Sequence, residues 1–159
     1  MFFGQRPSGR PFNAGDHFTS KYLDAPNEPL YAFGYGLSYG RFVLSELRVT
    51  PATVTESDTI VAQVRVGNEG PRAAEQTVFL FTRDKLASVA RPLLELKGFA
   101  KVSLRPGESA TVSIELAAAD LRFAGPDLRP VFEPGEIEIF MGPSAERTAL
   151  LSASLQLRA

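Results

Sequence analysis

The stretch "IVAQVRV" (residues 60–66) decides the fold of this chain. Its apolar residues recur at every second position, and Gln63 and Arg65 stand between them. Successive side chains of a β-strand point to opposite faces, so this spacing predicts a strand that is buried on one side only. The buried side is expected to carry Ile60, Ala62, Val64 and Val66.

The same alternation recurs in six further stretches, which are residues 43–49, 77–83, 99–104, 110–116, 136–141 and 149–157. In the first of these, the pattern places Val43, Leu47 and Val49 on one side of the strand. In the last three, the inward positions are Ala110, Val112, Ile114, Leu116, Ile137, Ile139, Met141, Leu151, Ala153, Leu155 and Leu157. Turns rich in Gly, Pro and Asn separate the strands, because these residues suit chain reversals.

Only residues 117–123 have a helical composition, and about two turns of helix are too short to connect parallel strands. We therefore expect an all-β chain in which about seven antiparallel strands form a two-sheet sandwich, fibronectin type III-like or immunoglobulin-like. Residues 1–40 are rich in Gly, Pro, Asn and Asp and lack a period, which predicts an irregular N-terminal arm or linker. The sandwich is expected to occupy residues 41–159.

The composition excludes several classes of function. Seventeen Lys and Arg oppose 18 Asp and Glu, and this net charge of −1 gives no support to nucleic-acid binding. The absence of cysteine excludes disulfides and thiolate metal sites but leaves the compartment open, whether cytoplasmic, periplasmic or secreted. No stretch approaches the ~20 apolar residues of a membrane span, so no membrane partner is expected. We expect no metal and no cofactor.

Candidates for catalysis are few. Glu136 and Glu138 lie two apart on a strand, as a glycosidase pair could, but they alternate with isoleucines and are interpreted as solvated carboxylates with ordinary pKa values. His17 is the only histidine and is interpreted as a surface residue. The stretch "GYGLSYG" (residues 34–40) is followed by a strand, not by the helix that a phosphate-binding loop requires.

A cluster of aromatic residues and glycines precedes the first strand, in "EPLYAFGYGLSYGRF" (residues 28–42). One hypothesis makes Tyr31, Tyr35 and Tyr39 a platform that stacks on sugars, since aromatic rings supply flat apolar surface. The other makes the cluster a clasp buried against the sandwich. The clasp hypothesis predicts mostly buried side chains for Phe33, Tyr35, Leu37 and Phe42.

Several long motifs together resemble one family. "GRPF", "TSKYLDAPNEPLYAFGYGLSYGRF", "RDKLASVARPLLELKGFAKVSLRPGESATVSIEL", "AADLRF" and "VFEPGEIEIFMGPSA" occur in the order and spacing of the C-terminal part of glycoside hydrolase family 3, the β-glucosidase family. In that family such a stretch leads from a middle α/β domain into a fibronectin type III-like domain. The chain departs from the family pattern at Ala32, where proline is usual, and at Gly40, where threonine is usual.

The resemblance brings no catalytic residue to this chain. The family's nucleophile is an aspartate in an SDW-like motif of an N-terminal barrel, and its acid/base is a glutamate of the middle domain. The aspartates here stand in no such context: Asp16, Asp24, Asp58, Asp84, Asp120 and Asp127. The resemblance thus implies an accessory domain, inactive alone and separated from upstream catalytic domains. Two alternatives remain open, namely a carbohydrate-binding module and a domain that self-associates through its exposed interdomain surface.

Overall fold

This computed structural model describes residues 6, 13, 15, 16, 18, 19 and 28–159. All seven predicted strands are present, joined by three strands of two residues each and two short 3₁₀ helices. The elements are β1 (Phe42–Thr50), β2 (Thr53–Val54), β3 (Thr59–Asn68), β4 (Ala74–Asp84), β5 (Glu95–Leu104), β6 (Ser109–Ala117), η1 (Ala118–Leu121), β7 (Phe123–Ala124), β8 (Pro130–Val131), β9 (Gly135–Gly142), η2 (Arg147–Ala149) and β10 (Leu151–Leu157). None of the described helices is long and apolar enough to cross a bilayer.

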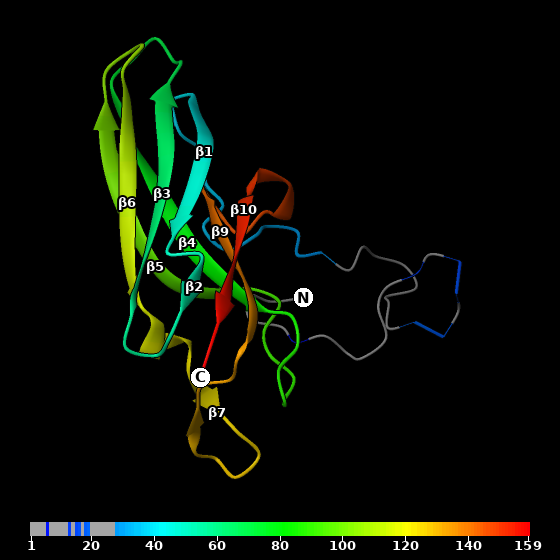
Figure 1. The fold of residues 1–159 in the computed structure, drawn as a ribbon. Helices are drawn as coiled ribbons and strands as arrows, with labels where there is room; N and C mark the ends of the chain where they lie inside the picture. The colour runs from blue at the N-terminus through cyan, green and yellow to red at the C-terminus, as the bar shows by residue number, and fades with distance from the viewer. Residues whose placement is uncertain (1–5, 7–12, 14, 17, 20–27) are drawn as a thin grey trace.

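Two sheets pack face to face, which confirms the predicted sandwich (Figure 1). One sheet has the order β1-β3-β6, and the other has the order β2-β10-β9-β4-β5. Neighbouring strands are antiparallel, except that β2 runs parallel to β10. β7 and β8 form a small separate hairpin between β6 and β9.

The core lies between the sheets and follows the alternation read from the sequence. The predicted inward residues of β3 have no exposed surface, namely Ile60, Ala62, Val64 and Val66. They meet apolar residues of the facing sheet, among them Val78, Leu80, Ile139 and Met141. Burying each Val, Ile, Leu or Met side chain contributes about 1.5–3 kcal/mol, so this layer supplies most of the drive for folding.

The first strand differs from its prediction. Val43 is exposed, while Phe42 and Leu44 pack against the core together with Leu47 and Val49. The pairing of β1 with β3 shifts register between residues 45 and 48, and Glu46 has a φ of 54° inside this irregularity. Because a bulge inserts one residue, it reverses which positions face inward on its N-terminal side. The assignment of Val43 to the buried side was therefore wrong.

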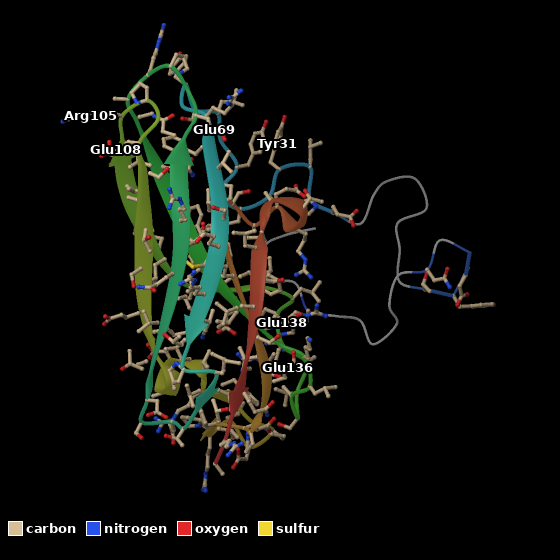
Figure 2. The ribbon with its side chains drawn as sticks, turned by 45° about the horizontal axis from the view of Figure 1, so that its top comes forward. Tyr31, Glu69, Arg105, Glu108, Glu136 and Glu138 are labelled. Atoms are coloured by element: carbon tan, nitrogen blue, oxygen red, sulfur yellow. The ribbon has the colours of Figure 1, made fainter. Side chains whose placement is uncertain are left out.

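A buried asparagine holds the end of the sandwich where β3 leads into β4. Asn68 is 1% exposed, and its Nδ2 donates to the carbonyl oxygens of Arg72, at 2.8 Å, and Leu104, at 3.0 Å. Its Oδ1 accepts from the backbone N–H of Gly70 at 2.9 Å. These bonds tie the β3–β4 connection to the end of β5, at the end of the molecule where Figure 2 labels Glu69, Arg105 and Glu108.

Candidate interaction surface

The segment before β1 makes a tight turn against the five-stranded sheet. The backbone N–H of Tyr35 donates to the carbonyl oxygen of Ala32 at 2.9 Å, and Gly34 between them has a φ of 81°. A Cβ atom on Gly34 would lie only 2.8 Å from Cε2 of Phe79 on β4. Glycine is required here for two reasons, because the turn needs a positive φ and because the backbone passes this close to a ring.

Phe33 fixes the turn to the outer face of this sheet, which is the face turned away from the core. Its ring meets that of Phe79 edge-on, with centroids 5.6 Å apart. Its carbonyl oxygen accepts from the backbone N–H of Ala145, just before η2, at 2.8 Å. Figure 2 shows Tyr31 beside this η2 region. A ring contact and a backbone hydrogen bond therefore hold the turn to this side of the sandwich.

Most of the aromatic segment is nevertheless exposed, which contradicts the predicted burial. Phe33, Tyr35 and Leu37 are all exposed, and only Phe42, on β1, is half-buried. The turn presses Ala32 and one edge of Phe33 onto the sheet and leaves the neighbouring side chains pointing outward. An extended segment that lies on a sheet can bury only the side chains on its sheet-facing side. The clasp is therefore limited to Ala32 and Phe33 and does not include the whole segment.

The three candidate sugar-binding tyrosines are exposed but do not form one plane. Their exposed fractions are 64% for Tyr31, 57% for Tyr35 and 91% for Tyr39. The rings of Tyr31 and Tyr35 lie 4.8 Å apart at an angle of 43°. No ring contact joins Tyr39 to either of them in the part of the chain that the structure describes. The structure therefore brings together a tilted pair, and Tyr39 stands apart.

Sequence reasoning missed a second apolar cluster on the outer face of the five-stranded sheet. Phe81, Leu94 and Phe140 are buried there, with Phe79 and Leu150 packed against them. The signal was present in "TVFLFTR" (residues 77–83), where both alternating sets of positions are apolar. A strand that is apolar on both sides indicates that both of its faces are covered.

The rings of Phe79 and Phe99 lie 6.4 Å apart on neighbouring strands, and Phe99 is 62% exposed. The exposed and half-buried rings on this side thus form one surface, which we call the aromatic face and define as Tyr31, Phe33, Tyr35, Phe79 and Phe99. It combines one turn of the N-terminal segment with the edge of the sheet at β4 and β5.

The two carboxylates considered for catalysis are neutralised by cations. Lys85 Nζ lies 2.9 Å from Glu136 Oε1 and 3.4 Å from Glu138 Oε1, and Arg83 lies 3.5 Å from Glu138 Oε2. The hydrogen bond from Lys85 lowers the pKa of Glu136, with a further contribution from Ser154. The expectation of an ordinary pKa was therefore wrong for Glu136. A carboxyl group with a lowered pKa is deprotonated at neutral pH and unsuited to act as a general acid.

The loop between β4 and β5 (residues 85–94) is held over this side of the sheet from several elements. Glu133 accepts from the backbone N–H of Ser88 at 2.9 Å, and hydrogen bonds from Ser88 lower the pKa of this carboxyl. Arg147 of η2 donates to the carbonyl oxygen of Leu93 at 3.3 Å. The tip residue Leu86 is exposed. The loop is therefore preorganised and projects beside β9 (Figure 1).

Among the described residues, no three or more His, Cys, Asp or Glu gather in an arrangement that could hold a metal ion. His17, interpreted from the sequence as a surface residue, lies outside the described residues. Burial raises the pKa of Asp84, the charges of Glu133 and Glu95 add to that shift, and a hydrogen bond from the backbone N–H of Leu86 and the Arg91 charge oppose it.

Comparison with known proteins gives consistent matches. Residues 76–145 match the model of the fibronectin type III-like domain. The chain is 36% identical over 149 residues to the periplasmic beta-glucosidase of Salmonella typhimurium, covering 92% of this chain and 20% of that protein. It is 37% identical over 139 residues to thermostable beta-glucosidase B of Acetivibrio thermocellus, covering 86% of this chain and 18% of that protein.

A solved structure agrees in fold as well. The crystal structure of beta-glucosidase from Listeria innocua matches with a TM-score of 0.89 and 34% identity, over 99% of this chain and 22% of that one. This chain thus spans about a fifth of the length of the relatives that it matches. The resemblance read from the sequence motifs is confirmed.

Proposed function

Because this chain is a fibronectin type III-like domain that corresponds to one part of longer β-glucosidases, we propose that it serves as a C-terminal accessory domain of a β-glucosidase-like hydrolase. The longer enzyme would hydrolyse O-glycosidic bonds, and this domain would support its catalytic domains mechanically. The chain by itself would perform no catalysis.

The proposal rests on one observation, which is that the alignment covers nearly all of this chain but only a small part of its relative. Nearly all of this chain, 92%, matches only 20% of the Salmonella beta-glucosidase. The best carboxylate pair on the described part of the chain, Glu136 and Glu138, is bound to Lys85 and Arg83. The two carboxyl groups of a glycosidase flank the bond that is cleaved, whereas both carboxyl groups of this pair are occupied by ion pairs with neighbouring cations.

The way in which the N-terminal segment meets the sandwich supports a mechanical role. A turn that depends on Gly34 and is held by Phe33 connects residues 28–41 to β4 and to the segment between β9 and η2. A joint fixed in this way restricts the orientation of whatever precedes it far more than a flexible linker does.

The experiment is a chimera. In thermostable beta-glucosidase B, the matched segment is replaced by this chain, and a second version simply lacks the segment. We expect the chimera to hydrolyse an aryl β-glucoside and to retain activity on heating longer than the version without the segment. Equal inactivation of the two versions would contradict the supporting role. Activity of the isolated chain, lost on replacing its own carboxylates, would contradict the assignment altogether.

A second candidate function, carbohydrate binding, is favoured by the exposure of Tyr31, Tyr35 and Tyr39. Aromatic rings with this exposure can stack on the apolar faces of pyranose rings, although the 43° tilt between Tyr31 and Tyr35 suits a bent ligand better than a flat one. Calorimetric titration with gluco-oligosaccharides tests it. Millimolar or tighter binding that is lost in Tyr31→Ala and Tyr35→Ala would support this function, and the absence of heat would exclude it.

A further inference from the structure

We infer that the aromatic face is the surface on which the remaining, catalytic part of the same β-glucosidase-like polypeptide docks; this inference rests on the proposed function. The surface consists of Tyr31, Phe33, Tyr35, Phe79 and Phe99.

The two outer faces of the sandwich differ in chemistry. On the three-stranded sheet, the outward positions of β3 and β6 are polar and exposed, and include Gln63, Arg65, Thr111, Ser113 and Glu115. On the five-stranded sheet, the outward positions of β4, β5 and β9 include Phe79, Phe81, Leu96, Phe99 and Phe140 beside charged residues such as Glu75 and Lys101. Phe81 and Phe140 are already buried against Leu94 and Leu150 of this chain, whereas Phe99 remains 62% exposed. An exposed ring at the border of a covered aromatic cluster indicates that a further contact continues the cover.

The surroundings of the aromatic face have the anatomy of an interface. Charged residues near it are already paired, as with Lys101 and Glu75, whose atoms lie 2.8 Å apart beside Phe99. Farther along the same sheet face, where Figure 2 labels Glu136 and Glu138, both carboxylates form ion pairs with Lys85. An apolar aromatic centre with a rim of paired charges is typical of protein–protein contacts.

The face is also preorganised. Tyr31 and Tyr35 flank a turn that Phe33 and Gly34 hold to the sheet, and Phe79 and Phe99 stand on paired strands. A partner therefore meets a fixed surface and loses little conformational entropy in ordering it. This property is expected of a permanent contact within one polypeptide.

The occupant is the rest of the polypeptide, because the relatives are about five times as long as the part that this chain matches. A second copy of the chain fits less well. The nearest route to self-association is strand addition at the free edge of β5, next to Phe99. That edge carries Lys97 and Lys101, and its pairing with β4 is interrupted between Leu80 and Phe81. Edge lysines and bulges oppose strand addition.

The test uses the chimera with thermostable beta-glucosidase B and the double variant Tyr35→Ser/Phe99→Ser. A matched control, Val43→Ser/Leu128→Ser, removes two exposed apolar side chains away from the aromatic face, Leu128 being 83% exposed. We expect the half-life of activity on heating to fall by about tenfold or more in the face variant, because contact with one aromatic side chain is worth at least that factor. The control should retain the half-life of the unmodified chimera.

Two further measurements separate the outcomes. The melting temperature of the isolated chain should be nearly the same with and without the face variant, which shows that the sandwich itself is intact. Hydrogen exchange of residues 30–37 and of β5 should be slower in the chimera than in the isolated chain. If the chimera is protected on heating but the face variant equals the control, the docking surface is wrong and the proposed function stands.

If the chimera is no better than the version without the segment, both the docking surface and the proposed function are contradicted. Light scattering of the isolated chain tests whether a second copy of the chain occupies the aromatic face instead. A dimer that the face variant abolishes, together with a chimera that the variant leaves unchanged, would assign the face to a second copy and overturn the inference.

Discussion

Replacing Asn68 by alanine is expected to lower the free energy of unfolding by about 2–6 kcal/mol. The substitution removes three hydrogen bonds from a side chain that is 1% exposed. Two of the groups left behind are buried, the N–H of Gly70 and the carbonyl of Leu104, and each unsatisfied group costs about 1–3 kcal/mol. The third, the carbonyl of Arg72, belongs to an exposed residue and can bond to water instead.

The assay is urea denaturation followed by circular dichroism, with thermal melting as a second measurement. At about 4 °C per kcal/mol for a domain of this size, the melting temperature should fall by about 8–24 °C. Asp127→Ala is the matched control, because Asp127 Oδ1 also accepts a backbone N–H two residues ahead, from Arg129 at 3.1 Å, but on an exposed turn. That control should lose less than about 1 kcal/mol. An equal loss in both variants would refute the reasoning about burial.

Three other substitutions test the outer face. Gly34→Ala should weaken the turn by about 1–2 kcal/mol, because alanine would adopt a φ of 81° and press on Phe79; faster hydrogen exchange of residues 32–35 checks it. Phe81→Ala should cost about 3–5 kcal/mol in urea denaturation, as a buried aromatic in the second cluster. Lys85→Met should raise the pKa of Glu136, which NMR titration measures. Since the pKa of Glu136 is lowered in the folded state, the stabilisation by Lys85 is present above the usual carboxyl pKa and disappears as the pH falls through the folded value.

The inner core was predictable because one periodicity determines it. In β3 the residues Ile60 to Val66 alternate without interruption, so the buried set could be read directly. In β1 a bulge at Glu46 moves Val43 to the outside. The core-facing residues change phase there, from Phe42 and Leu44 before the bulge to Leu47 and Val49 after it. This change of phase is visible in the sequence, but Val43 was assigned to one uninterrupted set with Leu47 and Val49.

The candidate surface was only partly predictable, for a related reason. The aromatic residues of 31–42 were identified, but whether each is buried depends on what lies against it. Phe33 packs against Phe79, whereas Tyr35 contacts only one side of the exposed Tyr31 ring and Leu37 is 93% exposed. The sequence shows how many aromatic side chains the segment has, but whether each is buried depends on which other parts of the fold pack against it.

The strand β4 links the core to the proposed function. Val78 and Leu80 on one side complete the sandwich core, and that core alone accounts for a stable two-sheet fold. On the other side, Phe79 contacts the rings of Phe33 and Phe99 at the surface, and Phe81 is buried in the second apolar cluster. Phe99 belongs to neither apolar cluster and remains 62% exposed, and a ring held in this way indicates a contact beyond the domain. For this reason substitution of Phe99 should separate stability of the sandwich from support of a catalytic partner, and substitution of Phe81 or of the inner residues Val78 and Leu80 should not.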